Sequence, residues 1–341
     1  MKFGLFGGAR VGEDGPRSDS QGYASFVNYI VEAERLGYES MFLVEHHFTG
    51  IGQVSSSLSL LAYLAAKTST IRLGTGVVVL PWHNPVLVAE QAATLDLLSN
   101  GRFDFGVGRG YRKSEFEGFG VPMEEAAERF EEAIEVIRKS WVSRDRFSHH
   151  GKRWNYENIV VEPPVKQKPH PPLWIGAGNL DVIRRGAREG FNLLLDQVAP
   201  IALIGERVAA FRDECERIGR TYTPDMVGVT RGYYLARTPE ERSEQKARRE
   251  QILASIGGIR QTNAPLPGPD EDDAPLFGSP AEIIERLRAL ERVGVGYVLV
   301  SDPSGNLEAL RVFAKEVMPA MRTNVGRASG VGMASLVGQE A

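Results

Sequence analysis

The 341-residue sequence predicts a single (β/α)8 barrel, the TIM-barrel fold, on three observations. Eight short apolar runs rich in β-branched and aromatic residues recur along the chain, separated by longer stretches with helical periodicity. Most runs are almost continuously apolar, as in Val-Val-Val-Leu at 77–80, which indicates strands buried on both faces and therefore parallel pairing. Eight strand–helix units joined by right-handed crossovers close into a barrel. The predicted strands are residues 3–6, 40–44, 71–80, 103–107, 173–176, 191–195, 226–235 and 297–300.

The segments between the strands carry apolar side chains at the spacing of helices that pack on a core. Three such stripes are Phe130, Ile134, Ile137 and Trp141; Ile283, Leu287 and Leu290; and Leu310, Phe313, Val317 and Met321. Ser279, Pro280 and Glu282 are typical of a helix start, with an N-cap and a proline in the first turn. An open doubly wound sheet is the alternative fold. It is disfavoured because Gly7-Gly8-Ala9-Arg10 lacks the glycine spacing of a dinucleotide site.

Two segments interrupt the alternation, and a third follows it. Residues 142–172 carry aromatic and valine residues among turn residues and then five prolines, which predicts a strand-rich insertion before the fifth strand. Residues 255–278, rich in glycine, proline and acids, predict a mobile loop and candidate lid after the seventh strand. We expect the barrel to occupy residues 1–322 and residues 323–341 to form a disordered tail.

The composition excludes several classes of partner. A formal net charge of −4 and a pI of about 6.0 give no basic footprint for nucleic acid. No apolar run reaches the roughly 20 residues that span a bilayer, and the amino terminus lacks a signal-peptide pattern. The single cysteine, Cys215, excludes an intramolecular disulfide, and its charged surroundings favour an inert thiol. We therefore expect a cytoplasmic protein that binds neither nucleic acid nor membranes.

Ionisable residues follow the second strand, at the end of the barrel where active sites form. Glu45, His46 and His47 are consecutive there, and three such side chains are costly unless they bind a ligand or one another. Side chains alternate along an extended chain, so His46 should point away from the other two. We predict that His46 is a catalytic proton donor or hydrogen-bond partner and that Glu45 is a second catalytic residue. For His47 a structural role and a functional role remain open.

The histidines do not predict a metal site. Adjacent histidines at a strand end point apart, and the remaining four have no ligand-like spacing along the chain. Those four are His83, His149, His150 and His170.

Glycines surround the ends of the next strands. Gly74-Thr75-Gly76 indicates a bend for barrel closure, the close approach of a flat ligand, or both. Arg109 lies between Gly108 and Gly110, a turn that suits an anionic group approached by backbone N–H donors and a guanidinium. We assign Gly108, Arg109 and the nearby Tyr111 to a cofactor site.

A further turn, containing Gly178 and Asn179, leads from the fifth strand directly into a helix. It is either a phosphate site at a helix N-terminus or a simple turn with an asparagine cap. Together the four strand ends suit a phosphorylated planar cofactor lying across the barrel mouth.

These residues belong to a series of motifs that closely resembles the bacterial luciferase-like flavin monooxygenases. The order and spacing of the motifs match the family from Met1 to about Met321. The motifs are Glu45-His46-His47-Phe48-Thr49, Gly74-Thr75-Gly76 with Val79-Leu80-Pro81, Ala89-Glu90-Gln91, Leu98-Ser99-Asn100-Gly101-Arg102-Phe103, Gly106-Val107-Gly108-Arg109-Gly110, Leu173-Trp174-Ile175-Gly176, Phe277-Gly278-Ser279-Pro280-Ala281-Glu282 and Val317-Met318-Pro319.

The resemblance implies a (β/α)8 barrel that binds reduced FMN, usually delivered by a separate flavin reductase. It implies that O2 adds at the flavin C4a carbon and that the resulting peroxide attacks an aldehyde or another small organic substrate. By the same resemblance His46 matches the histidine of the flavin–oxygen chemistry, and Arg109 the arginine that contacts the flavin phosphate. Thr75 and Gly76 match a pair joined by a non-prolyl cis peptide bond. Gly178 and Asn179 match the phosphate-binding turn.

Two departures from the luciferases argue against light emission. Gly108 stands where the light-emitting subunit has a reactive cysteine, and residues 255–278 are shorter and richer in proline than the luciferase lid. We therefore predict a non-luminescent monooxygenase.

Three other functions remain as alternatives: a deazaflavin (F420)-dependent dehydrogenase, a non-catalytic flavin-binding protein, and a metal-dependent hydrolase. Aromatic residues near the mouth, among them Phe48 and Tyr111, favour an apolar organic substrate. Related barrels pair through the helices after strands two and three, here residues 58–68 and 85–98, so we expect a homodimer.

Overall fold

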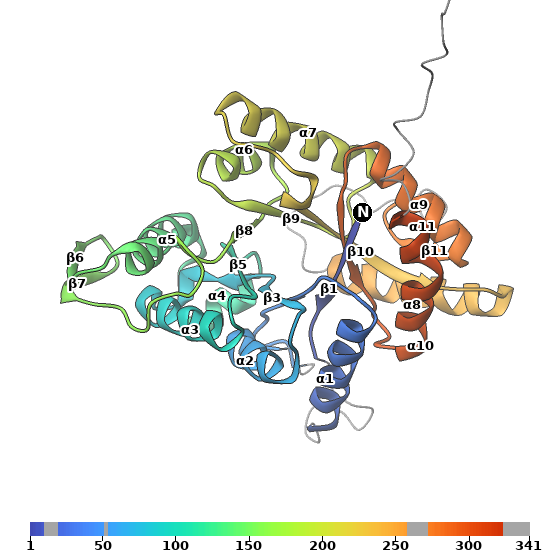
Figure 1. Ribbon diagram of the computed structural model, residues 1–341, viewed down its shortest axis with the longest axis horizontal. Helices are drawn as coiled ribbons and strands as arrows, with labels where there is room; N and C mark the ends of the chain where they lie inside the picture. The colour runs from blue at the N-terminus through green and yellow to red at the C-terminus, as the bar shows by residue number, and fades with distance from the viewer. Residues whose placement is uncertain (10–19, 51–53, 258–271, 323–341) are drawn as a thin grey trace, which may run out of the picture.

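The computed structural model describes residues 1–9, 20–50, 54–257 and 272–322. Eight parallel strands follow one another around a closed ring in the order β1-β2-β3-β5-β8-β9-β10-β12, and β12 pairs with β1 to complete it (Figure 1). The predicted (β/α)8 barrel is confirmed. The ring strands are β1 (Lys2–Gly7), β2 (Ser40–Leu43), β3 (Arg72–Thr75), β5 (Phe103–Gly108), β8 (Leu173–Gly176), β9 (Asn192–Leu195), β10 (Val227–Leu235) and β12 (Tyr297–Ser301).

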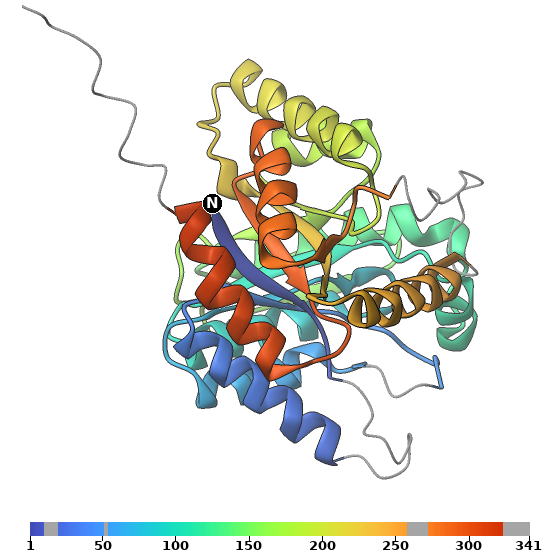
Figure 2. The same cartoon turned by 90° about the vertical axis from the view of Figure 1, so that its right-hand side faces the viewer.

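Helices cover the outside of the ring, and segments from opposite ends of the chain lie together, with α10 beside α1 (Figure 2). The α-helices are α1 (Ser20–Arg35), α2 (Ser57–Lys67), α3 (Pro85–Leu98), α4 (Lys113–Phe119), α5 (Ala126–Val142), α6 (Leu180–Arg188), α7 (Ile201–Arg217), α8 (Pro239–Gly257), α9 (Pro280–Arg292), α10 (Leu307–Val312) and α11 (Met318–Arg322). Short 3-10 turns are η1 (Leu80–Trp82), η2 (Met123–Glu125) and η3 (Pro224–Met226), and η4 (Phe313–Val317) is a π-helical turn.

The predicted helical stripes are confirmed. Every residue of the three stripes is buried in the main core. Ser279 caps α9 and forms a capping box with Glu282, with Pro280 in the first turn, as the sequence predicts.

The predicted strand at residues 71–80 is wrong in its continuity, because β3 ends at Thr75 and a two-residue strand, β4 (Val78–Val79), follows. Where the backbone pairing between β3 and β5 stops, the Thr75 hydroxyl takes its place. Oγ1 donates to the carbonyl of Gly106 at 2.7 Å and accepts from its N–H at 2.8 Å. The chain then bulges at Gly76 and Val77, both half-buried, before β4 pairs with β5. The bulge therefore turns backbone toward the barrel axis.

The barrel interior below this bulge is filled by large side chains. The rings of Phe42 and Trp174 lie 5.1 Å apart, and Tyr297 lies 6.2 Å from Trp174. Gly74 makes room for the first ring, since a Cβ there would lie 2.5 Å from Phe42. Val77 packs on top of this plug. The interior of the ring is therefore filled at this level by the side chains of Phe42, Trp174 and Tyr297.

The predicted strand-rich insertion is confirmed as an antiparallel hairpin of β6 (Phe147–His150) and β7 (Asn155–Ile159). Glu132 on α5 holds it, accepting from the N–H groups of Arg153 and Trp154. The predicted mobile loop at 255–278 lies largely outside the described residues, and the strand β11 (Leu276–Gly278) ends it. The predicted tail, 323–341, also lies outside the described residues.

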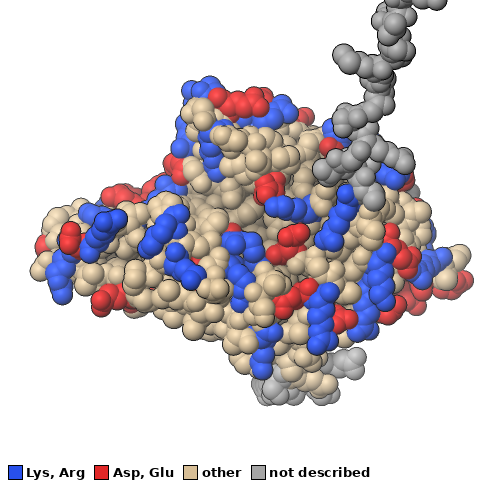
Figure 3. All heavy atoms as spheres, viewed as in Figure 1, with Lys and Arg blue, Asp and Glu red and all other residues tan. Residues whose placement is uncertain are grey.

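The surface carries charges of both signs. On the face in Figure 3, lysine and arginine side chains alternate with aspartate and glutamate. In the described ranges, no helix is both long enough and apolar enough to cross a bilayer.

Candidate active site

The predicted site residues follow four neighbouring strands of the ring, β2, β3, β5 and β8. The carboxyl ends of parallel strands meet at one edge of the barrel, so these residues share one half of its mouth. The structure therefore brings the predicted site residues to one side of the fold.

His46 is held by a carboxylate that the sequence analysis missed. Its Nδ1 lies 3.1 Å from Oε1 of Glu115, in the first turn of α4, and the same oxygen accepts from the N–H of His47 at 3.0 Å. The other ring nitrogen, Nε2, lies 3.4 Å from Nη2 of Arg112. A guanidinium can only donate, so the arrangement favours the tautomer with the proton on Nδ1 and the lone pair on Nε2.

Glu115 is suited to orient this histidine. Although burial opposes ionisation, the hydrogen bonds from His46 and from the backbone of His47 lower the pKa of the Glu115 carboxyl. Its side chain is only 2% exposed. No sequence pattern marks the pair, because 69 residues separate the two side chains. One signal in the sequence could have pointed to Glu115: it is an acidic residue in the first turn of the helix that follows the turn containing Arg109.

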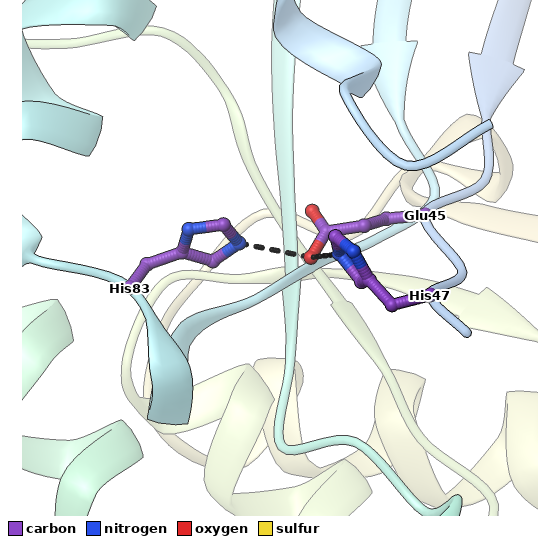
Figure 4. Close-up of side chains that lie close together, drawn as sticks. All are labelled: Glu45, His47 and His83. Atoms are coloured by element: carbon purple, nitrogen blue, oxygen red, sulfur yellow. Dashed lines mark hydrogen bonds and ion pairs between the residues drawn. The ribbon is translucent and has the colours of Figure 1, made fainter. Parts of the chain in front are cut away.

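Glu45 is the centre of a second cluster, drawn in Figure 4. Its Oε1 lies 3.1 Å from Nε2 of His47 and 2.8 Å from Nε2 of His83, and it accepts from the indole N–H of Trp82 at 3.1 Å. Although burial opposes ionisation, the hydrogen bonds from the two histidines lower the pKa of Glu45 to about 2. Glu45 is therefore a buried anion whose Oε1 atom is hydrogen-bonded to His47, His83 and Trp82.

The structure gives the two histidines that follow the second strand different partners. His46 and His47 do diverge, one toward Glu115 and the other toward Glu45. His83 joins the second cluster although it lies 38 residues beyond Glu45, which is why its spacing carried no signal. His47 and His83 are thus brought together with a carboxylate, which the sequence analysis did not anticipate.

Gly76 and Val77 form the floor of the mouth beside these residues. The predicted cis peptide bond is present, but its predicted position between Thr75 and Gly76 is wrong: it joins Gly76 to Val77. Thr75 stays in β3 because its hydroxyl bridges to Gly106, and it is fully buried. Thr75 therefore shapes the floor from below, and the half-buried Gly76 and Val77 face the mouth.

Gly108, which has no side chain, lies directly against Val77 in the same floor. A Cβ on Gly108 would lie 2.6 Å from Cγ2 of Val77. The absence of a side chain there lets β5 approach the bulge closely.

The two predicted phosphate contacts have different environments. Arg109 is exposed, and it makes no hydrogen bond or ion pair with any residue in the described ranges. Asn179 is exposed and caps α6, its side chain accepting from the N–H of Asp181 at 2.8 Å. The cap interpretation of Asn179 is thus present in the structure, since its side chain satisfies one N–H group of the first turn.

Aromatic rings line the side of the mouth next to His47. Phe48, 61% exposed, stacks edge-on against Phe119, and Phe119 lies parallel to Trp82 at 5.2 Å. Tyr111 is half-exposed and its ring lies 6.4 Å from that of His46. An exposed aromatic wall beside a histidine–carboxylate pair suits an organic substrate.

Residues 1–297 match the family described as luciferase-like monooxygenase. The chain belongs to this family. The predicted resemblance and the predicted enzyme class, a monooxygenase of this family, are confirmed.

Curated relatives of this luciferase-like monooxygenase are named flavin enzymes and oxygenases. Limonene 1,2-monooxygenase of Rhodococcus erythropolis is 40% identical, covering 88% of this chain and 82% of the relative. The oxygenase component of the flavin-dependent trigonelline monooxygenase of Acinetobacter baylyi is 29% identical, covering 94% and 95%. The alignment with an uncharacterised Sinorhizobium fredii protein, 35% identical, covers 52% of this chain and about half of that protein, 52%.

Solved structures show the same fold. Monooxygenase RslO1 of Streptomyces bottropensis superposes with a TM-score of 0.84 at 24% identity, covering 94% of this chain and 100% of that one. An F420-dependent secondary alcohol dehydrogenase superposes with a TM-score of 0.76 at 16% identity, covering 94% and 99%. These two superpositions show that the fold of this chain is shared by both proteins.

Proposed function

We propose that this protein is the oxygenase component of a two-component system, which takes FMNH2 from a separate flavin reductase and oxidises a small organic substrate with O2. The observation that carries the proposal is the pair formed by His46 and Glu115 at the carboxyl ends of the barrel strands. The relatives support the use of a flavin and an oxygenase reaction. For the substrate we propose a chemical class, a small organic molecule.

The mouth fits reduced FMN. Gly76 and Gly108 let the backbone pack closely at the floor, since a Cβ would lie 2.9 Å from Phe6 in the first case and 2.6 Å from Val77 in the second, and a planar ring system would rest on this surface. Arg109 and the first turn of α6 supply a cation and N–H donors for the phosphate. When bound, reduced FMN supplies the electrons that activate molecular oxygen.

The chain's own residues then perform three tasks. Glu115 holds the Nδ1 proton of His46, and Nε2 would accept or return a proton in exchange for its contact with Arg112. Arg112 places a positive charge 3.4 Å from that nitrogen. Phe48, Phe119 and Tyr111 offer apolar surface to the substrate and limit the access of water.

The decisive experiment is stopped-flow absorbance after the anaerobic protein–FMNH2 complex is mixed with oxygenated buffer. We expect a transient species that precedes oxidised FMN and lives longer than in free flavin. Oxidation at the rate of free flavin, with no transient, would reject the monooxygenase proposal.

His46→Ala tests the assigned catalytic residue. We expect reduced FMN to bind nearly as in the wild type, while substrate oxygenation falls by about 100-fold or more, the scale of a lost acid–base group. His150→Ala is the matched control, because His150 is exposed and pairs with Glu157 in the remote hairpin. Undiminished oxygenation in His46→Ala would remove His46 from the mechanism.

An F420-dependent dehydrogenase is the second candidate, supported by the structural likeness to such an enzyme. Anaerobic titration with each cofactor separates the two.

We also propose a homodimer through α2 and α3, whose outer surfaces expose Tyr63, Leu87 and Leu98. We further propose a cytoplasmic location.

A further inference from the structure

The cluster around Glu45 has a donor set that the proposed oxygenase chemistry does not require. Oε1 of Glu45, Nε2 of His47 and Nε2 of His83 all lie within 4.8 Å of one another. Figure 4 shows the two imidazoles directed at one carboxylate oxygen from two separate segments, one after β2 and one after η1. We propose that these three side chains bind a divalent transition metal ion of the zinc type.

The ligand types and distances fit such an ion. Two histidines and one carboxylate are a common protein set for zinc, with a fourth position left open for water. Ligand atoms bound to one ion at bond lengths near 2.1 Å are separated by about 3.0–3.4 Å. Here the carboxylate oxygen lies 3.1 Å from one imidazole nitrogen and 2.8 Å from the other, close to the separation of two ligands of one ion.

The surroundings favour a metal over an ordinary surface ion pair. Glu45 is 2% exposed, so its negative charge has little water to stabilise it, whereas His83 is 31% exposed and gives an ion a route in. Trp82 donates to the ligating oxygen, as groups around metal-bound carboxylates do. Phe119 packs edge-on against the His47 ring at 4.7 Å and fixes its orientation.

Metal binding would connect two segments of the mouth. His46 lies between two of the ligands in the sequence, so the ion would fix the segment that carries it. The inference does not depend on the proposed function, because the cluster needs neither flavin nor O2 to form.

The test uses the full chain without an affinity tag, stripped with EDTA and free of flavin, titrated with Zn2+ by calorimetry and with Co2+ by visible absorption. We expect one equivalent of each ion, a visible band for low-coordinate Co2+, and a melting temperature that rises with Zn2+ concentration. His83→Ala should weaken Zn2+ binding by at least about 100-fold and abolish the Co2+ band.

Two further variants make the result decisive. His150→Ala removes a different histidine–glutamate pair and should leave the stoichiometry and the band unchanged. Glu45→Gln keeps the side-chain shape and should also weaken binding; His83→Ala, at a partly exposed position, decides the matter if Glu45→Gln does not fold. Equal binding by wild type and His83→Ala, or no binding by wild type at micromolar Zn2+, would overturn the proposal.

Discussion

The carboxylate of Glu115 connects two parts of the barrel mouth that are far apart in sequence. One oxygen serves both the His46 ring and the His47 backbone, so a single side chain sets the position of the whole segment after β2. Orientation of a catalytic imidazole by a buried acid is a recurrent solution for proton transfer. Glu115 is accordingly a positioning residue in the proposed mechanism.

Glu115→Gln tests this role. The amide retains an acceptor oxygen but removes the charge, so we expect unchanged affinity for reduced FMN and a shorter-lived oxygen-dependent transient, by about 10-fold. Glu115→Asp should restore part of the lifetime. A parallel loss of FMN affinity and of folding stability would instead indicate a purely structural residue.

Arg109→Ala tests the phosphate contact. Loss of a charge-assisted hydrogen bond should weaken FMNH2 binding by roughly 1–3 kcal/mol, measured by anaerobic fluorescence titration. Lys113→Ala is the control, because Lys113 is a nearby exposed cation that pairs with Glu117 on its own helix. Equal affinities for the Arg109 variant and the wild type would move the phosphate elsewhere.

At the scale of single residues, local patterns predicted the strand-end positions, whereas pairing between distant residues was not visible. His46 and Arg109 stand out because ionisable or glycine-flanked residues at a strand end need an explanation. Glu115 and His83 acquire their meaning only from partners brought together by the closed ring. The cis bond was misplaced by one residue, because its position between Thr75 and Gly76 was taken from the family resemblance, and the structure has it between Gly76 and Val77.

At the scale of elements, the junction of β3 and β5 depends on a side chain that replaces part of the backbone ladder. Thr75→Val removes the hydroxyl and leaves the buried N–H and C=O of Gly106 without that partner. We expect a loss of about 1–3 kcal/mol in the free energy of unfolding, measured in urea.

Thr94→Val provides the comparison for this prediction. Thr94 also bonds a carbonyl, that of Glu90, but on the exposed face of α3, so its replacement should cost less than about 0.5 kcal/mol. Similar losses for the two variants would show that the bridge does not stabilise the junction.

Apolar periodicity predicted most elements because burial on both faces and the helical stripe are encoded locally. The eight ring strands and the hairpin insertion follow from such runs and from turn residues. The interruption of the third strand could not be predicted, because Val78 and Val79 continue an apolar run that reads as one strand.

At the scale of the whole molecule, the exposed face of α3 bears on assembly. Leu87 and Leu98, 55% and 61% exposed, lie on one face of α3, and the neighbouring α2 exposes Tyr63; exposed apolar surface of this kind is typical of an interface. Leu98→Glu should convert a micromolar dimer to monomer in sedimentation velocity. Ile218→Glu, an exposed apolar position beyond α7, should not. A monomeric wild type would contradict the proposed dimer.

The hydrogen bond between His46 and Glu115 also constrains how such enzymes can be recombined. The histidine comes with the segment after β2, and its acid comes with α4, two strands further around the ring. Exchanging either segment alone with a relative that lacks the pair would leave an imidazole without its acid or a buried carboxylate without its donor. The two segments therefore have to be transferred together. Chimeras that receive both should retain activity, whereas chimeras that receive only one should lose it.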